Sequence, residues 1–169
     1  MTEAASQPMA DYGPGTVLKR ATELRAFRIA PSDTNYFALL LDPIAEGVTF
    51  TLVVEIFAPG GATPPNSHAA AHEVFFVLRG EGVAISDGQR VSIAAGDTLL
   101  LPPGSVHVVE NTGPGKLYCL TMMQPNEGFA ELTRAGTPVD LDEEDVAVLT
   151  GALVKGAPLK GALRSGGKA

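Results

Sequence analysis

The sequence predicts an all-β domain, a sandwich or a barrel, followed by a short C-terminal helical segment. Its 19 Gly and 13 Pro are many for 169 residues, and Trp is absent, which favours turns and short elements. Short apolar segments rich in β-branched residues recur at intervals of roughly 8–12 residues with turn signals between them. The length fits one domain more easily than two.

The chain opens with an expected N-terminal arm and first strands over residues 1–35. Residues 1–14 are small and polar, and the Gly13-Pro14-Gly15 break lies at their end. The later apolar segments predict strands at 36–41, 48–57, 74–78, 83–85, 91–93, 98–101, 106–110 and 117–123. Segment 74–78 is apolar at every position, so both of its faces are expected to be buried. Asp87-Gly88 is the strongest short hairpin signal of the chain.

The character of the chain changes after residue 123, where a C-terminal helical extension is expected over 124–150. Residues 127–134 have room for two helical turns, and 140–149 is the better helix candidate because acids gather at its N-terminal end. Residues 151–169 hold four basic residues and no acid, and we interpret them as a flexible basic tail.

Composition excludes several classes of function. A net charge of -7 and a pI near 4.9 argue against a nucleic-acid-binding surface. Cys119 is the only cysteine, which excludes an internal disulfide framework and a cysteine-based zinc cage. No apolar run approaches membrane-spanning length, so no membrane partner is expected. The polar, acidic N-terminus lacks the features of a signal peptide, and the cytoplasm is the default compartment.

Two long spaced patterns carry the chemical signal. The first runs Gly60, five residues, Asn66-Ser67-His68, four residues, Glu73, six residues and Gly80. The second runs Gly96, five residues, Pro102, one residue, Gly104, two residues, His107, three residues and Asn111. All three histidines of the protein lie inside these patterns.

The two patterns closely resemble the motifs of the cupin family. The second cupin motif is complete, and the first lacks a single anchor, because Asn66 stands where the family has its first His. The resemblance implies a double-stranded β-helix, the jelly-roll barrel of cupins, over residues 36–123, with a metal site inside it. It also implies a homodimer, since cupins of this size are commonly dimers.

The spacing makes independent physical sense of a metal site. Residues two apart on a strand point to one face, so position 66 and His68 can project together into a barrel. Glu73 would come from the start of the next strand and His107 from a strand across the barrel. Imidazole and carboxylate suit one divalent transition metal, Fe(II) first, with Mn(II), Ni(II), Zn(II) or Cu(II) as alternatives.

Asn66 leaves two interpretations of this site open. Its amide oxygen is a weak ligand, or it hydrogen-bonds a metal-bound water or substrate; alternatively the metal has been lost. Without it, His68, Glu73 and His107 form the two-His-one-carboxylate set of non-haem Fe(II) oxygenases. His72 directly precedes Glu73, so on a regular strand it points away from the metal.

Five other side chains or sets matter to the prediction. Glu55 lies either on the solvent side of an edge strand or inside the barrel, where it would be a candidate acid or base. Tyr118 and Cys119 face opposite sides, and Cys119 is expected to be a buried small hydrophobe. Asn111 is read as a turn residue tied to the backbone. The parity of Glu73 makes three residues candidates to line the cavity: Phe75, Val77 and Arg79.

Three functions follow from this prediction. The first is a metal-dependent (di)oxygenase acting on a small organic substrate. The second is a redox-neutral isomerase, decarboxylase or cyclase in the same barrel, which needs a separate acid or base such as Glu55. The third is a non-catalytic binding or sensing module. The outward face of Val74, Phe76 and Leu78 needs a cover, either the N-terminal strands or a second subunit, which also points to a homodimer.

Overall fold

The computed structural model describes residues 15–152 and confirms the predicted all-β class. The predictions for the arm over 1–14 and for the tail from 153 onward fall outside the described residues. No helix within residues 15–152 is long and apolar enough to cross a membrane. The elements, in order, are η1 (Ala21–Glu23), β1 (Arg25–Arg28), β2 (Asn35–Leu41), α1 (Pro43–Glu46), β3 (Thr51–Phe57), β4 (His72–Arg79), β5 (Glu81–Ser86), β6 (Gln89–Ala94), β7 (Thr98–Leu101), β8 (His107–Asn111), β9 (Leu117–Gln124), α2 (Phe129–Arg134), β10 (Thr137–Val139) and α3 (Glu143–Leu149).

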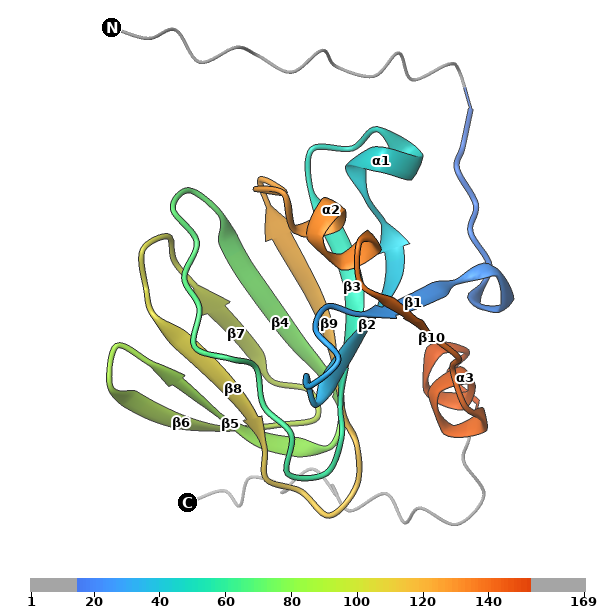
Figure 1. Cartoon of the computed structure of the whole chain (residues 1–169). Coiled ribbons are helices and arrows are strands. Elements are labelled where there is room, and N and C mark those ends of the chain that lie inside the picture. The colour runs from blue at the N-terminus through green and yellow to red at the C-terminus, as the bar shows by residue number, and fades with distance from the viewer. Residues whose placement is uncertain (1–14, 153–169) are drawn as a thin grey trace, which may run out of the picture.

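Two antiparallel sheets face each other and enclose the core (Figure 1). The larger sheet has the strand order β10-β1-β2-β3-β9-β4-β7, and the smaller has the order β6-β5-β8. Apolar side chains from both sheets meet between them, which removes them from water and stabilises the closed arrangement. This interior cluster comprises Phe57, Phe75, Val77, Ala84, Ile93, Leu101, Val109, Leu117 and Cys119.

The predicted hairpin joins β5 to β6. Asp87 and Gly88 have φ of 47° and 82°, and Ser86 pairs with Gln89 across the turn. Two consecutive positive φ values match the twist of adjacent strands, and Gly adopts such a conformation without a Cβ penalty.

Strand β4 departs from two expectations. Only one of its faces is buried, because Phe76 and Leu78 remain 40% and 37% exposed while Phe75 and Val77 lie in the interior. Its register also shifts between Val77 and Arg79, which pair with the adjacent residues Cys119 and Tyr118 of β9. This β-bulge turns the side chain of Arg79 away from the cavity, where it forms an ion pair with Glu144 of α3.

Strand β3 starts later than the predicted residue 48, at Thr51. The backbone carbonyl of Thr49 instead accepts a hydrogen bond from the amide of Asn126. Asp42, directly after β2, caps α1, and its carboxylate accepts hydrogen bonds from the amides of Ile44 and Ala45.

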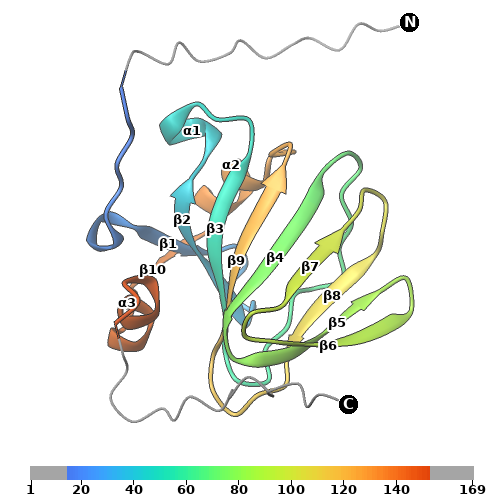
Figure 2. The same cartoon turned by 180° about the vertical axis from the view of Figure 1, so that it is seen from behind.

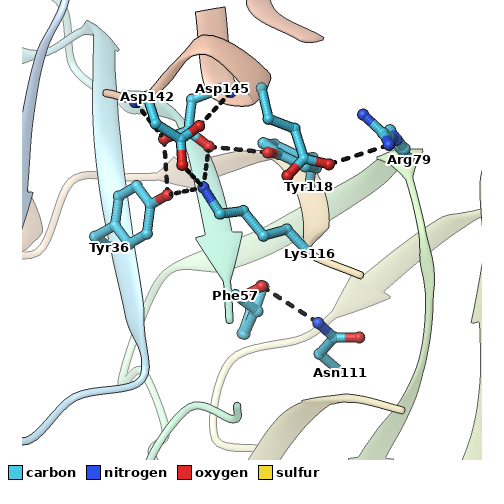
Figure 3. A network of polar contacts seen from close by, with 9 residues as sticks. Tyr36, Phe57, Arg79, Asn111, Lys116, Tyr118, Asp142 and Asp145 are labelled. Carbon is cyan, nitrogen blue, oxygen red and sulfur yellow. Dashed lines mark hydrogen bonds and ion pairs between the residues drawn. The ribbon is translucent and has the colours of Figure 1, made fainter. Parts of the chain in front are cut away.

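A polar cluster fastens α3 to the outer face of the large sheet (Figure 3). The buried carboxylate of Asp145 accepts hydrogen bonds from the hydroxyls of Tyr36 and Tyr118, both at 2.8 Å. Lys116 Nζ lies 2.8 Å from Asp145 and 2.6 Å from Asp142, the N-cap of α3. Burial, together with Asp145, raises the pKa of Tyr36 to about 12 although the hydrogen bond from Lys116 opposes this, so the phenol stays protonated at neutral pH.

Helix α2 lies over the open end of the large sheet, next to α1 (Figures 1 and 2). It begins at Phe129 rather than at the predicted residue 127, because Glu127 and Gly128 have positive φ. The Phe129 ring packs edge-on against Phe37 of β2 with centroids 5.3 Å apart. The guanidinium of Arg134 binds both carboxylate oxygens of Asp42, at 3.2 and 2.6 Å. These contacts place α2 against the mouth of the barrel.

Candidate metal centre

Three predicted side chains from three parts of the chain converge inside the barrel. His68 lies in the loop before β4, Glu73 in β4 and His107 at the start of β8. The Nε2 atoms of His68 and His107 lie 3.2 and 2.9 Å from the same oxygen, Oε2 of Glu73. Their ligating atoms all lie within 4.8 Å of one another.

Backbone pairing brings the loop and the strand together. Asn66 and His107 exchange two hydrogen bonds as an isolated antiparallel bridge, N–H to O at 3.1 and 2.9 Å. Residues paired in this way project their side chains to the same face. The carbonyl of His68 accepts a hydrogen bond from the amide of Gly104 at 2.7 Å, which holds the loop at its other end.

The hydrogen bond of His107 Nδ1 determines whether Nε2 of the same ring has a lone pair for a metal. Nδ1 donates to the backbone carbonyl of Ser105 at 3.1 Å. In the neutral ring this leaves a lone pair on Nε2, the atom that faces Glu73. Nδ1 of His68 lies 3.9 Å from a carboxylate oxygen of Glu127, and the same carboxylate accepts a hydrogen bond from the amide of Ala70. Glu127 therefore lies on the Nδ1 side of the His68 ring, away from the Nε2 atom that faces Glu73.

The cluster is electrostatically coupled. Burial alone would raise the pKa of Glu73, but its hydrogen bonds to His107 and His68 outweigh burial and lower that pKa below its ordinary value. The hydrogen bond to Glu73 in turn raises the pKa of His68, against the opposing effect of burial. Glu73 is thus held as a carboxylate, the form in which it can ligate a metal.

The side chain of Asn66 gives a second indication that the cluster could bind a metal ion. Its amide nitrogen donates to the carbonyl of Pro64 at 3.2 Å, while its amide oxygen is buried and has no hydrogen-bond partner in the described part of the chain. Ligands held at about 2.1 Å from a metal and at right angles lie about 3 Å apart, close to the His–Glu distances found here. The donor set and the unpartnered oxygen therefore fit a divalent transition metal.

Glu55 lies inside the barrel, on the central strand β3 between β2 and β9, and not at an edge. Its carboxylate accepts a hydrogen bond from Asn35 Nδ2 at 2.6 Å. Burial, and then the charge of Glu73, raise the pKa of Glu55 well above its usual range, although the Asn35 hydrogen bond opposes this. A buried carboxyl with this property can hold a proton near neutral pH.

A cavity of about 180 Å³ joins Glu55 to the three-residue cluster. Phe75 lines it as expected, whereas Val77 lies in the interior cluster and Arg79 on the outer face. The sequence prediction missed Asn35 and Phe129, which also line the cavity. Both lie outside the motifs, and only the tertiary fold brings them to the site.

The remaining predicted residues lie outside the cluster. His72 is exposed, and Cys119 is a buried free thiol whose pKa is raised by burial. Asn111 donates to the carbonyl of Phe57, as Figure 3 shows, and also to those of Ala58 and Gly115. Its oxygen accepts from the amide of Gly113. Its side chain thus ties the β8–β9 turn to the end of β3.

The fold and this cluster define a small β-barrel with a candidate two-His-one-Glu metal centre. The family model for the cupin domain matches residues 53–123, which include all three ligand candidates. The chain belongs to the cupin superfamily.

Several known proteins are similar to parts of the chain. An uncharacterized protein of Methanocaldococcus jannaschii is 34% identical over 52% of this chain and 72% of its own length. An oxalate-binding protein of Thermotoga maritima is 35% identical over 38% of this chain and 54% of its own length. The oxalate oxidase 1 of Hordeum vulgare is 32% identical over 48% of this chain and 46% of its own length. The matched region thus spans about half the length of these two proteins.

Among solved structures, a predicted oxalate decarboxylase of Thermotoga maritima superposes with a TM-score of 0.58. It is 27% identical, and the superposition covers 64% of this chain and 99% of that one. A cupin-2 domain of Rhodospirillum rubrum has a TM-score of 0.55 at 22% identity, with 83% and 90% of the two chains covered, and shows the fold alone.

Proposed function

We propose that this cupin is a metal-dependent enzyme of the non-haem Fe(II) oxygenase type that acts on a small organic molecule. The observation that carries the proposal is the convergence of His68 Nε2 and His107 Nε2 on one oxygen of Glu73. Two imidazoles and one carboxylate are the facial ligand set of such oxygenases. The name of one relative, an oxalate oxidase, supports an oxidative reaction of a small molecule.

His68, Glu73 and His107 would hold the metal, and Asn66 would stand beside them as a weak ligand or as a partner for bound water or substrate. When bound, Fe(II) in such a set supplies open coordination positions for substrate and dioxygen. Ser105 keeps the His107 ring oriented, and the apolar residues around the cavity exclude water from it.

Glu55 favours a second candidate, a redox-neutral reaction in the same barrel. Its raised pKa allows it to hold or release a proton, and it opens into the same cavity as the cluster. In an isomerase, decarboxylase or cyclase, Glu55 would be the acid or base, and Asn35 would orient it.

We further propose that the protein works as a homodimer in the cytoplasm. Cys119, the only cysteine, is a buried free thiol, as suits a reducing compartment. Exposed apolar side chains on the outward face of β4 supply a surface that a second copy would cover.

Metal content tests the proposal directly. Protein purified without chelator or a nickel column is expected to carry close to one iron or manganese per chain, measured by elemental analysis. His107→Ala is expected to lose at least about tenfold in metal affinity. His72→Ala is the matched control, because His72 is exposed and outside the cluster, and it should retain the metal.

Absence of bound metal, even after anaerobic addition of Fe(II), would overturn the enzyme proposal in favour of a binding module. With metal present, oxygen consumption in screens of small aromatic and diketone substrates separates the two enzymatic candidates. Glu55→Gln should abolish a redox-neutral reaction. An oxygenase reaction should retain measurable turnover in that variant.

A further inference from the structure

We propose that the cavity takes an uncharged, largely apolar organic molecule of about the size of one substituted six-membered ring. We further propose that it disfavours small carboxylates, oxalate included. This inference deepens the proposed function and rests on it for the statement that the bound molecule is a substrate. It sets this chain apart from the relatives whose names refer to oxalate.

Size and lining point to an apolar body. A buried cavity of roughly 150 Å³ lined by Leu, Ile and Phe holds benzene in another protein, and the volume here is about 180 Å³. Most of its wall is apolar, which favours burial of hydrocarbon surface. The apolar residues are Ile29, Phe37, Phe75, Met123, Phe129 and Leu132.

Much of this wall is supplied from outside the region that matches the cupin family. Ile29 and Phe37 precede that region, and Phe129 follows it on α2. The metal-ligand candidates lie within residues 53–123, but much of the surface that would select the bound molecule lies outside that range. Similarity in the matched region therefore says little about which molecule is bound.

The acids that line the cavity have no lysine or arginine beside them. They are Asp33, Glu55 and Glu73, of which Glu73 is held as a carboxylate, and no Lys or Arg within the described chain lines the cavity. Two cations of neighbouring elements are engaged elsewhere, since Lys116 binds Asp142 and Asp145. Arg134 likewise binds Asp42. A carboxylate entering the cavity would meet the negative charge of Glu73 and would have no lysine or arginine to pair with.

Asn35, which lines the cavity, offers a partner for a hydroxyl group. It is 2% exposed, and within residues 15–152 its side-chain oxygen has no hydrogen-bond partner, although its nitrogen donates to Glu55. A buried polar atom left unpartnered is costly, so a ligand that donates a hydrogen bond to this oxygen would relieve that cost. A hydroxyl on a small ring would do so while the ring packs on the phenylalanines.

Phenol and benzoate test the charge preference at nearly constant size. Their affinities, with that of oxalate, are measured by calorimetry on the full chain, both as purified with its metal and after chelator treatment. In the chelated protein phenol is expected to bind at least about tenfold more tightly than benzoate. Oxalate should bind only when metal is present, whereas phenol should retain most of its affinity after chelation.

Either of two results overturns the inference: benzoate or oxalate binds the chelated protein as tightly as phenol, or phenol does not bind at millimolar concentration. Neither result depends on the metal content of the protein. The proposed function can therefore fail in the metal analysis while this inference holds, and the reverse is equally possible. Asp33→Asn removes an acid from the cavity lining and should reduce the preference for phenol over benzoate at least about threefold. Glu143→Gln makes the same change at the exposed start of α3 and should leave the preference unchanged.

Discussion

Asn66 is the residue that distinguishes this candidate metal centre from the usual cupin pattern. An amide oxygen is a neutral and weaker ligand than an imidazole nitrogen, so a metal bound here would depend mainly on His68, Glu73 and His107. The backbone bridge to His107 nevertheless fixes position 66 beside the cluster, and its amide oxygen is buried without a partner among the described residues. The side chain at position 66 is therefore placed where it would modulate metal affinity.

Substitution at position 66 tests this role. Asn66→His restores the imidazole of the family motif and is expected to raise metal affinity at least about tenfold, because it adds a stronger donor to the existing three. Asn66→Ala is expected to lower it. Competition titrations against a chelator measure both changes. Equal affinities of all three proteins would show that the position 66 side chain takes no part in metal binding.

How far the site could be predicted depends on where each residue lies along the chain. His68, Glu73 and His107 follow from motif spacing, and the structure brings their ligating atoms together. Glu55 remained ambiguous, because its strand alone does not tell an edge from the interior of a barrel. Asn35 and Glu127 could not be predicted, since they reach the site only through the pairing of β2 with β3 and the position of the loop before α2.

At the scale of elements, α2 closes the mouth of the barrel through a few identifiable contacts. Its N-terminal end places Phe129 against Phe37, and its last residue, Arg134, binds the carboxylate that caps α1. Asp42 thus joins two helices, and it is fully buried. Loss of its charge is expected to loosen α2 and, with it, one wall of the cavity.

Asp42→Asn tests this connection. Asn keeps the cap of α1 but loses the charged hydrogen bonds to Arg134, so the free energy of unfolding should fall by about 1–3 kcal/mol. Denaturant titration measures the change. Arg134→Lys, which keeps the charge but not the paired geometry, should lose less. An unchanged stability of Asp42→Asn would show that α2 docks without this pair.

The same residue predicts a pH dependence. Burial alone would raise the pKa of Asp42, but Arg134 and the backbone amides outweigh it and lower the pKa below its ordinary 3.8. A lowered pKa in the folded state stabilises the fold above the unfolded value, and this contribution is lost as the pH falls through the folded value. The stability difference between the wild type and Asp42→Asn should therefore shrink below pH 3.8 and vanish in stronger acid.

Element boundaries show why sequence periodicity has limits here. The alternation along β4 predicts that Phe75 and Val77 face inward, and they do, but the bulge after Val77 reverses Arg79. A bulge inserts one residue and changes no residue type, so the pattern contains no sign of it. Helix α2 similarly starts two residues late because Glu127 and Gly128 adopt positive φ.

At the scale of the whole molecule, the metal-ligand candidates and much of the cavity wall come from different parts of the chain. Residues 53–123, which match the family model, carry the ligand candidates on β4, β8 and the loop before β4. Outside that range, β1, β2, β10 and the helices extend the large sheet and supply much of the cavity wall. Such a division would allow one kind of metal centre to serve different substrates.

The outer face of the large sheet leads to the last prediction, a homodimer. Phe76 and Leu78 on β4 and Leu100 on β7 are apolar and exposed, the last by 58%. Val74 pairs directly with Leu100, so these side chains form one surface across two neighbouring strands. A two-fold axis would place this exposed apolar surface against the same surface of a second copy, which would remove it from water.

Light scattering coupled to size-exclusion chromatography should give twice the 17.5 kDa mass of one chain. Phe76→Glu is expected to yield monomers, because two such charges would face each other across the two-fold axis. Val106→Glu is the matched control: Val106 is also apolar and exposed, but it lies beside the β5–β6 hairpin, so this variant should remain dimeric. A monomeric wild type at micromolar concentration would contradict the prediction. If Phe76→Glu also retained its metal, the metal centre would be complete within one chain and the dimer would serve stability alone.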